Sequence, residues 1–136
     1  MERFSLRLTV LSGLYGVVRL QPTDTIPPWA LHEEWVSITR TMDELSIVCR
    51  ADSIPPGAKA ELRFFLLKVE GPLAFSEVGI LASLTSTLAA VEISLLAIST
   101  FDTDYLLVRE NQLDATVVAL EEAGHEIRNS EPGSSC

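Results

Sequence analysis

Cysteine is scarce in this chain, since only Cys49 and Cys136 occur among its 136 residues. No CxxC pair and no group of cysteine with histidine is present, which excludes the usual ligand sets of structural zinc. Cys49 lies in the apolar stretch 45–49, so we expect a buried and unreactive thiol. This use of cysteine is typical of a reducing compartment, and we expect neither a metal nor a cofactor.

Positive charge is also scarce. The chain has 10 Lys and Arg against 19 Asp and Glu, which gives a formal net charge of −9. Binding to a phosphate backbone requires basic residues, so we expect no nucleic acid partner and no anionic membrane partner. No stretch of about 20 apolar residues is present, and the first residues form no convincing secretory signal. We therefore expect a cytoplasmic protein.

Known catalytic motifs are missing as well. The sequence contains no GxSxG, P-loop, HExxH or GxGxxG pattern. Its two histidines, His32 and His125, have no nucleophile near them in the sequence, and a surface or hydrogen-bonded histidine is the simpler interpretation of each. We expect no catalytic residue and no enzyme activity.

Hydrophobic residues make up 47% of the chain and charged residues 21%, which is enough to form a core. The first half alternates apolar and polar residues in short runs, with proline-rich loops between them. This pattern predicts a half that is rich in strands and poor in helix, with the first two strands paired as a hairpin through Ser12-Gly13. The predicted strands are 4–11, 14–20, 35–41 and 45–50.

The second half has a clearer order of elements. An apolar strand over 62–69 precedes a helix over 76–91, whose leucines recur at spacings of three and four. A strand pair over 93–100 and 104–110, a helix after Asn111 and a short strand over 125–129 follow. Strand, helix, strand, strand, helix, strand is the split βαβ order of ferredoxin-like folds.

The predicted fold class is therefore α+β, with two ferredoxin-like subdomains built on antiparallel sheets. The N-terminal subdomain is the strand-rich, helix-poor one. We expect the boundaries at 1–61 for the N-terminal subdomain, 62–130 for the C-terminal one and 131–136 for a frayed tail.

The beginning of the first long helix is a candidate binding feature. Ser76 suits the N-cap position, and the main-chain N–H groups of Glu77, Val78 and Gly79 would then lack acceptors within the helix. The positive end of the helix dipole can bind a carboxylate or a phosphate there. Ser76 acting as a simple cap, with Gly79 packed on a strand, remains an equal alternative.

A polar corner between the two apolar strands is the second candidate feature. It contains Ser99, Thr100, Phe101, Asp102 and Asp104, an unusual concentration of hydroxyls and carboxylates for one turn. Carboxylates accept hydrogen bonds from an ammonium group, so this corner and the helix start together suit a zwitterion. Turn capping by aspartate and burial of the phenylalanine ring are the alternatives.

The segments 69–75, 79–84 and 98–108 resemble the ACT domain. More narrowly, they and the segments 35–41 and 43–48 resemble small bacterial tandem-ACT proteins related to the regulatory region of aspartate kinases and to the CASTOR arginine sensors. The resemblance implies a non-catalytic regulatory protein that binds an amino acid at an ACT–ACT interface, forms a homodimer and acts through an unknown downstream protein. The ligand-binding positions that it implies, with Asp104 facing a basic group, are Ser76, Glu77, Val78, Gly79, Ile80, Ser99, Thr100, Phe101, Asp102 and Asp104.

Two other functions remain open. One is a structural or oligomerising ACT module without a ligand, in which Asp104 pairs with Arg40 or faces solvent. The other is a small metal-dependent enzyme, which requires Glu77, Asp102 and Asp104 to converge on one ion.

Overall fold

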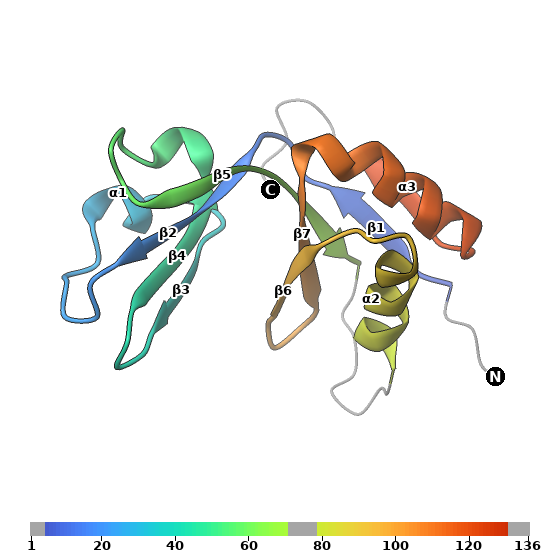
Figure 1. The fold of residues 1–136 in the computed structure, drawn as a ribbon, viewed down its shortest axis with the longest axis horizontal. Helices are drawn as coiled ribbons and strands as arrows, with labels where there is room; N and C mark the ends of the chain where they lie inside the picture. Colours follow the sequence, from blue (N-terminus) through green and yellow to red (C-terminus); the bar gives the residue numbers. More distant parts are fainter. Residues whose placement is uncertain (1–4, 71–78, 131–136) are drawn as a thin grey trace. The chain divides into compact units, whose positions relative to one another are not determined.

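A computed structural model describes residues 5–70 and 79–130 of the chain (Figure 1). Contacts between residues divide the chain into two units. The larger unit contains the described residues of 5–12 and 65–130, and the smaller unit contains residues 13–64. This division differs from the predicted boundary after residue 61, because it assigns residues 5–12 to the larger unit. The predicted tail, 131–136, lies outside the described residues.

The larger unit has the predicted strand, helix, strand, strand, helix, strand order, preceded by one extra strand. The last helix follows a 3₁₀ turn, η2 (Glu110–Gln112), so Gln112 and not Asn111 is its N-cap. The elements are β1 (Arg7–Val10), the second part of β5 (Ala60–Val69), α2 (Ile80–Ala90), β6 (Leu95–Ser99), β7 (Asp104–Arg109), α3 (Leu113–Glu122) and β8 (Glu126–Asn129).

The predicted hairpin between the first two strands is wrong. β1 instead lies between β5 and β8: Leu8 is opposite Val69 in an antiparallel pair and opposite Ile127 in a parallel pair. The sheet of the larger unit therefore runs β8-β1-β5-β7-β6. Alternation of apolar residues shows that a strand is half-buried, but it does not identify the neighbouring strand.

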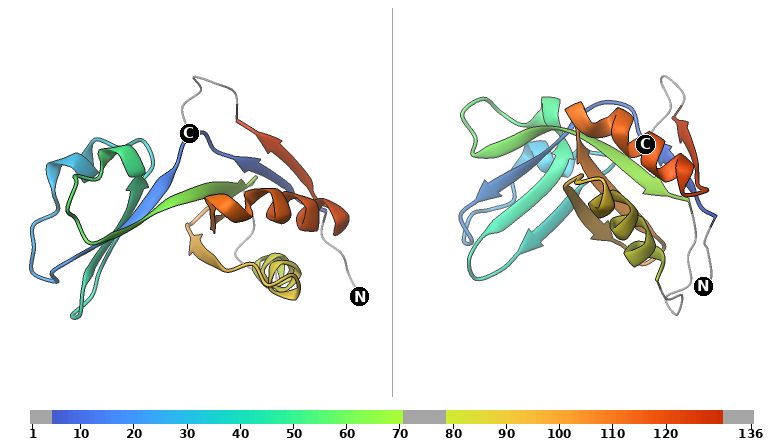
Figure 2. Two further views of the ribbon diagram at one scale, coloured as in Figure 1. Left: turned by 45° about the horizontal axis from the view of Figure 1, so that its top comes forward. Right: turned by 45° about the vertical axis from the view of Figure 1, so that its right-hand side comes forward.

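Both helices of the larger unit lie on one face of its sheet (Figure 2). The helices contact each other, and their buried residues join a single core with β1, β5 and β7. The predicted spacing on α2 is confirmed at Leu84 and Leu88, which have no exposed surface. The fully buried or nearly buried members of this core are Leu8, Val10, Leu67, Val69, Ile80, Leu84, Leu88, Ile93, Leu106, Val108, Ala119 and Leu120.

Each of these helices ends in a Schellman motif. At the end of α3 the N–H groups of Gly124 and His125 donate to Glu121 and Leu120, both at 3.0 Å. Gly124 has φ +102°, the left-handed conformation that glycine adopts without a steric cost. At the end of α2 the same position is held by Glu92, with φ 61°.

The smaller unit is a four-stranded sheet in the order β3-β4-β2-β5, with little helix. The predicted pairing of 35–41 with 45–50 is confirmed. Its core contains Ala30, Leu45, Ile47 and Cys49, so the predicted burial of Cys49 is also confirmed. Its elements are β2 (Tyr15–Leu20), α1 (Pro28–Leu31), β3 (Ser37–Arg40), β4 (Leu45–Arg50), the 3₁₀ turn η1 (Ala51–Ser53) and the first part of β5.

The two units together make an α+β protein in which most strand pairs are antiparallel. Among the described residues, no helix is both long enough and apolar enough to cross a membrane.

Candidate functional site

The corner between β6 and β7 is a tight turn stabilised by Thr100. The main-chain N–H of Thr100 donates to the carbonyl of Thr103 at 2.8 Å. The Thr100 hydroxyl donates to the same carbonyl at 3.1 Å and accepts from the N–H of Thr103 at 3.2 Å. The hydroxyl of Thr100 therefore serves the turn itself, as threonine often does.

Asp104 lies at the base of this turn, directly opposite Ser99 in the β6–β7 pair. The Ser99 hydroxyl donates to Oδ1 of Asp104 at 2.6 Å. A short hydrogen bond to a carboxylate orients the group. Oδ1 of Asp104 thus accepts a hydrogen bond. Within the described residues, Oδ2 accepts none. A half-buried, oriented carboxylate of this kind suits an ammonium or guanidinium group.

Phe101 and Asp102 form the exposed tip of the turn. The side chain of Phe101 is 79% exposed, so the alternative that it belongs to the core is wrong. Asp102 is exposed as well.

Thr103 is a residue that the sequence analysis missed. It is buried, and its hydroxyl donates a hydrogen bond to the main-chain carbonyl of Val69, the last residue of β5. This bond joins the corner to the strand end from which the chain leaves towards α2. Nothing in the local sequence indicates the contact, because the partner is 34 positions away.

The start of α2 differs from the prediction. Its N-cap is Gly79, in a left-handed conformation with φ 89°, and not Ser76. The first main-chain hydrogen bond of the helix runs from the N–H of Ser83 to the carbonyl of Gly79 at 2.7 Å. The N–H groups of residues 80–82 therefore have no acceptor within the helix. Ile80 contributes only its main chain, because its side chain belongs to the core. Ser76, Glu77 and Val78 lie outside the described residues.

The larger unit therefore contains both candidate features. Five predicted residues, Ser99 to Asp102 and Asp104, lie in or beside one turn. The first turn of α2 and the β6–β7 turn lie at the same end of this unit's sheet (Figure 1).

Two other predicted arrangements can be compared with the structure. Arg40 donates to the carbonyls of Pro22 and Asp24 within the smaller unit, the second at 2.9 Å. Among residues 5–70 and 79–130, no three His, Cys, Asp or Glu side chains are grouped to hold a metal ion.

Comparisons with known proteins follow this division of the chain. The model of the ACT domain matches residues 59–122, and the model of an N-terminal domain family matches residues 13–57. Residues 59–122 include β6, the corner, β7 and α2.

Solved structures show the same fold. The Agobacterium tumefaciens protein Atu0741 is 43% identical, with a TM-score of 0.88 over 93% of this chain and 95% of that one. The regulatory subunit of aspartate kinase from Thermus thermophilus, in its ligand-free form, superposes with a TM-score of 0.56 over 81% of this chain and 91% of that one. Its identity of 11% supports a similarity of fold alone.

A curated relative shares part of the sequence. The rat cytosolic arginine sensor for mTORC1 subunit 1 is 36% identical over 61 residues, which are 45% of this chain and 18% of the rat protein. The match of the ACT-domain model, the similarity to this sensor and the fold shared with a kinase regulatory subunit agree. The chain therefore contains an ACT domain over residues 59–122.

Proposed function

We propose that this protein is a non-catalytic regulatory protein that binds an amino acid next to the β6–β7 corner. The observation that carries the proposal is the oriented carboxylate of Asp104, held by Ser99 at 2.6 Å in a turn that Thr103 joins to the end of β5. The ammonium of the ligand would lie against Asp104. Its carboxylate would lie at the start of α2, where main-chain N–H groups and the helix dipole favour an anion.

The predicted positions in 76–78 complete this hypothesis. Ser76, Glu77 and Val78 precede Gly79, and with the exposed ring of Phe101 they would line the same site. The similarity to a cytosolic arginine sensor supports a small-molecule effector and a cytosolic location.

The site would be completed by a second copy of the chain, in a homodimer. β6 supports this: within the described residues its one strand partner is β7, and its apolar side chains are half-buried or exposed, with Leu96 44% exposed. An apolar edge strand is a template for pairing with another chain. The effector would then favour one arrangement of the dimer, which a downstream protein would recognise.

A thermal-shift screen of the twenty amino acids tests the proposal. A ligand at about 100 times its dissociation constant should stabilise the folded protein by about 2.7 kcal/mol. Asp104→Asn retains an acceptor for Ser99 but removes the charge, so it should abolish the shift. Asp114→Asn, on the exposed start of α3, is the matched control and should retain it.

The same exposed edge of β6 favours one second function, an oligomerising module without a ligand. A dimer that forms at low micromolar concentration, together with no thermal shift from any amino acid, would support that function over the sensor.

A further inference from the structure

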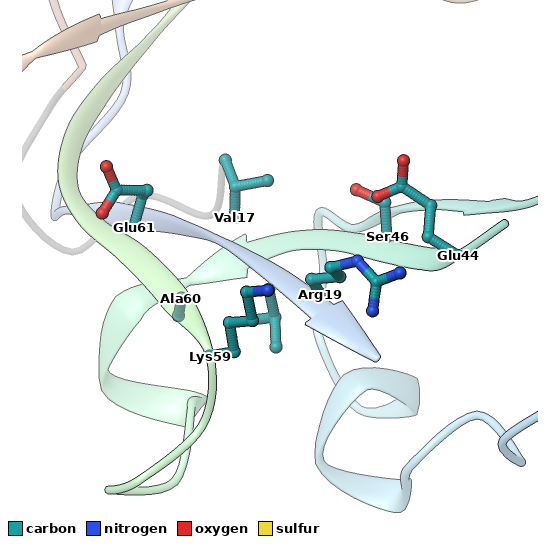
Figure 3. A pocket seen from close by; sticks show the side chains of 8 residues that line it. Val17, Arg19, Glu44, Ser46, Lys59, Ala60 and Glu61 are labelled. Carbon is teal, nitrogen blue, oxygen red and sulfur yellow. The ribbon is translucent and has the colours of Figure 1, made fainter. Parts of the chain in front are cut away.

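The smaller unit contains a hollow that lies outside the candidate site of the larger unit (Figure 3). Its volume is about 300 Å³, at the lower end of the range typical for metabolite sites. It lies over β2, β4 and the start of β5. Its lining residues are Val17, Val18, Arg19, Glu44, Ser46, Lys59, Ala60 and Glu61.

The register of the strands explains which side chains gather there. Arg19 on β2 is directly opposite Ser46 on β4, and the N–H of Arg19 donates to the carbonyl of Lys59 at 2.9 Å on the other side. Lys59, Arg19 and Ser46 therefore form one row across three adjacent chain segments. In the next row on the same face, Val17 lies opposite Glu61, because side chains alternate along each strand.

Two cationic residues thus belong to one row, and like charges opposite each other are unfavourable in a sheet. The guanidinium of Arg19 is oriented by one hydrogen bond, from Nη2 to the carbonyl of Asp43 at 2.9 Å. Within the described residues, neither Arg19 nor Lys59 is joined to a carboxylate by an ion pair. Both cations are therefore available to an anionic group of a ligand.

Two carboxylates also line the hollow. In Figure 3 the Arg19 side chain extends away from Lys59 towards the part of the view that holds Ser46 and Glu44, while Glu61 stands at the opposite end. Val17 and Ala60 supply an apolar surface between the polar groups. The two carboxylates would repel a ligand that carries negative charge throughout.

We propose that this hollow is a second ligand site, which binds the carboxylate or phosphate of a small metabolite between Lys59 and Arg19. The Ser46 hydroxyl donates to the same oxyanion. The rest of the ligand is neutral or positively charged, because Glu44 and Glu61 also line the hollow. The proposal is independent of the amino acid site in the larger unit, with which it shares no residue.

The test is an ¹H–¹⁵N NMR titration of the full chain at constant ionic strength. The probes are inorganic phosphate, acetate, L-alanine and methylammonium. Acetate and L-alanine represent a carboxylate source, phosphate represents a phosphorylated one, and methylammonium tests for binding of a cation alone. The expected result is a set of saturable shifts, confined to amides of residues 17–19, 46 and 59–61, with phosphate or with the carboxylates but not with methylammonium.

Variants identify the residues responsible. Lys59→Gln and Arg19→Gln should each weaken binding about tenfold, the effect of losing one charge-assisted hydrogen bond, and Arg19→Lys should weaken it less. Lys68→Gln, which removes a cation from the larger unit, should leave the affinity unchanged. Asp104→Asn should also leave it unchanged, which separates this proposal from the sensor hypothesis.

Three results would overturn the proposal: shifts that do not saturate, shifts scattered over both units, or an affinity that is the same in Lys59→Gln, Arg19→Gln and the unsubstituted protein. Equal binding of methylammonium at these amides would overturn it as well.

Discussion

The hydroxyl of Thr103 donates a hydrogen bond to the main-chain carbonyl of Val69. Thr103 is 5% exposed and Val69 is fully buried, so the bond is shielded from water. It joins the turn that carries Asp104 to the end of the central strand β5. The position of the candidate carboxylate therefore depends on a contact between residues far apart in the sequence.

Replacing Thr103 with valine should destabilise the protein. Valine has nearly the same shape but cannot donate, so the buried carbonyl of Val69 would lose its partner. A buried polar group left without a partner costs about 1–3 kcal/mol. Urea unfolding followed by circular dichroism measures this free energy.

Thr85→Val is the matched control for that measurement. The Thr85 hydroxyl donates to the carbonyl of Ala82 at 3.2 Å on the exposed surface of α2, so its loss should change the free energy of unfolding by no more than about 0.5 kcal/mol. Equal losses in the two variants would show that the Thr103 bond has no special role.

Stability should fall in mild acid because of His125. Its imidazole is 6% exposed and Nδ1 accepts a hydrogen bond from the N–H of Leu6 at 3.1 Å. Burial lowers the pKa of His125 from its ordinary 6.5. Below that value the unfolded chain takes up a proton at this site before the folded protein does, so the free energy of unfolding decreases as the pH falls through 6.5 towards the folded pKa. A series of urea titrations from about pH 8 to about pH 5 measures the slope.

His125→Gln should reduce that slope, since the titrating group is gone. His32→Gln is the control, because His32 is an exposed residue of the smaller unit, and it should leave the slope unchanged. A slope that is identical in all three proteins would assign the acid sensitivity to carboxylates instead.

The sequence predicted most elements of the fold from local patterns. Alternation identified the strand Leu45–Arg50 with the bounds that the structure has, and spacings of three and four identified α2. The left-handed glycine after α3 follows equally from local chemistry, since Gly124 stands where a helix normally ends. These features depend on residues within a few positions of each other.

Long-range relationships were not predictable in this way. The strand 4–11 was assigned to a hairpin because its alternation is compatible with any neighbour, whereas β1 pairs with β5 and β8. The N-cap of α2 was assigned to Ser76 from residue type, whereas Gly79 adopts the cap conformation. The contact of Thr103 and the row of Lys59 with Arg19 both require the strand register, which a single sequence does not specify.

Leu88→Ala should destabilise the larger unit strongly. Leu88 has no exposed surface and belongs to the core between the two helices and the sheet. Truncating such a leucine leaves a cavity, which costs about 2–5 kcal/mol. Val118→Ala on the exposed face of α3 is the control, and at 53% exposure it should cost about 1 kcal/mol or less. A comparable loss in both variants would contradict the burial of Leu88.

Cys49 should be unreactive in the folded protein. Burial, followed by the nearby charges of Glu33 and Asp52, raises the pKa of its thiol from 9.0 to about 11. This change alone lowers the reactive thiolate fraction at neutral pH about 100-fold. In a Cys136→Ser variant, where Cys49 is the remaining thiol, a chromogenic disulfide reagent should react slowly without denaturant and rapidly in concentrated urea. Rapid reaction of the folded protein would contradict the burial of this side chain.

Substitution at the two helix ends should have opposite effects on stability. Glu92 and Gly124 occupy the same position of the Schellman motif, with φ 61° and φ +102°, and a residue with a Cβ pays about 1–2 kcal/mol in this conformation. Glu92→Gly should therefore raise the free energy of unfolding by about 0.5–1 kcal/mol, since the flexibility of glycine in the unfolded chain offsets part of the relief of backbone strain.

Gly124→Ala should lower the free energy of unfolding by about 1 kcal/mol through backbone strain alone, because no atom lies within 4 Å of the added Cβ. Gly124→Asn, with a residue that tolerates the left-handed conformation better, should lose less. Both directions are measurable by urea unfolding, and a loss of stability in Glu92→Gly would show that the glutamate side chain contributes more than its backbone strain costs.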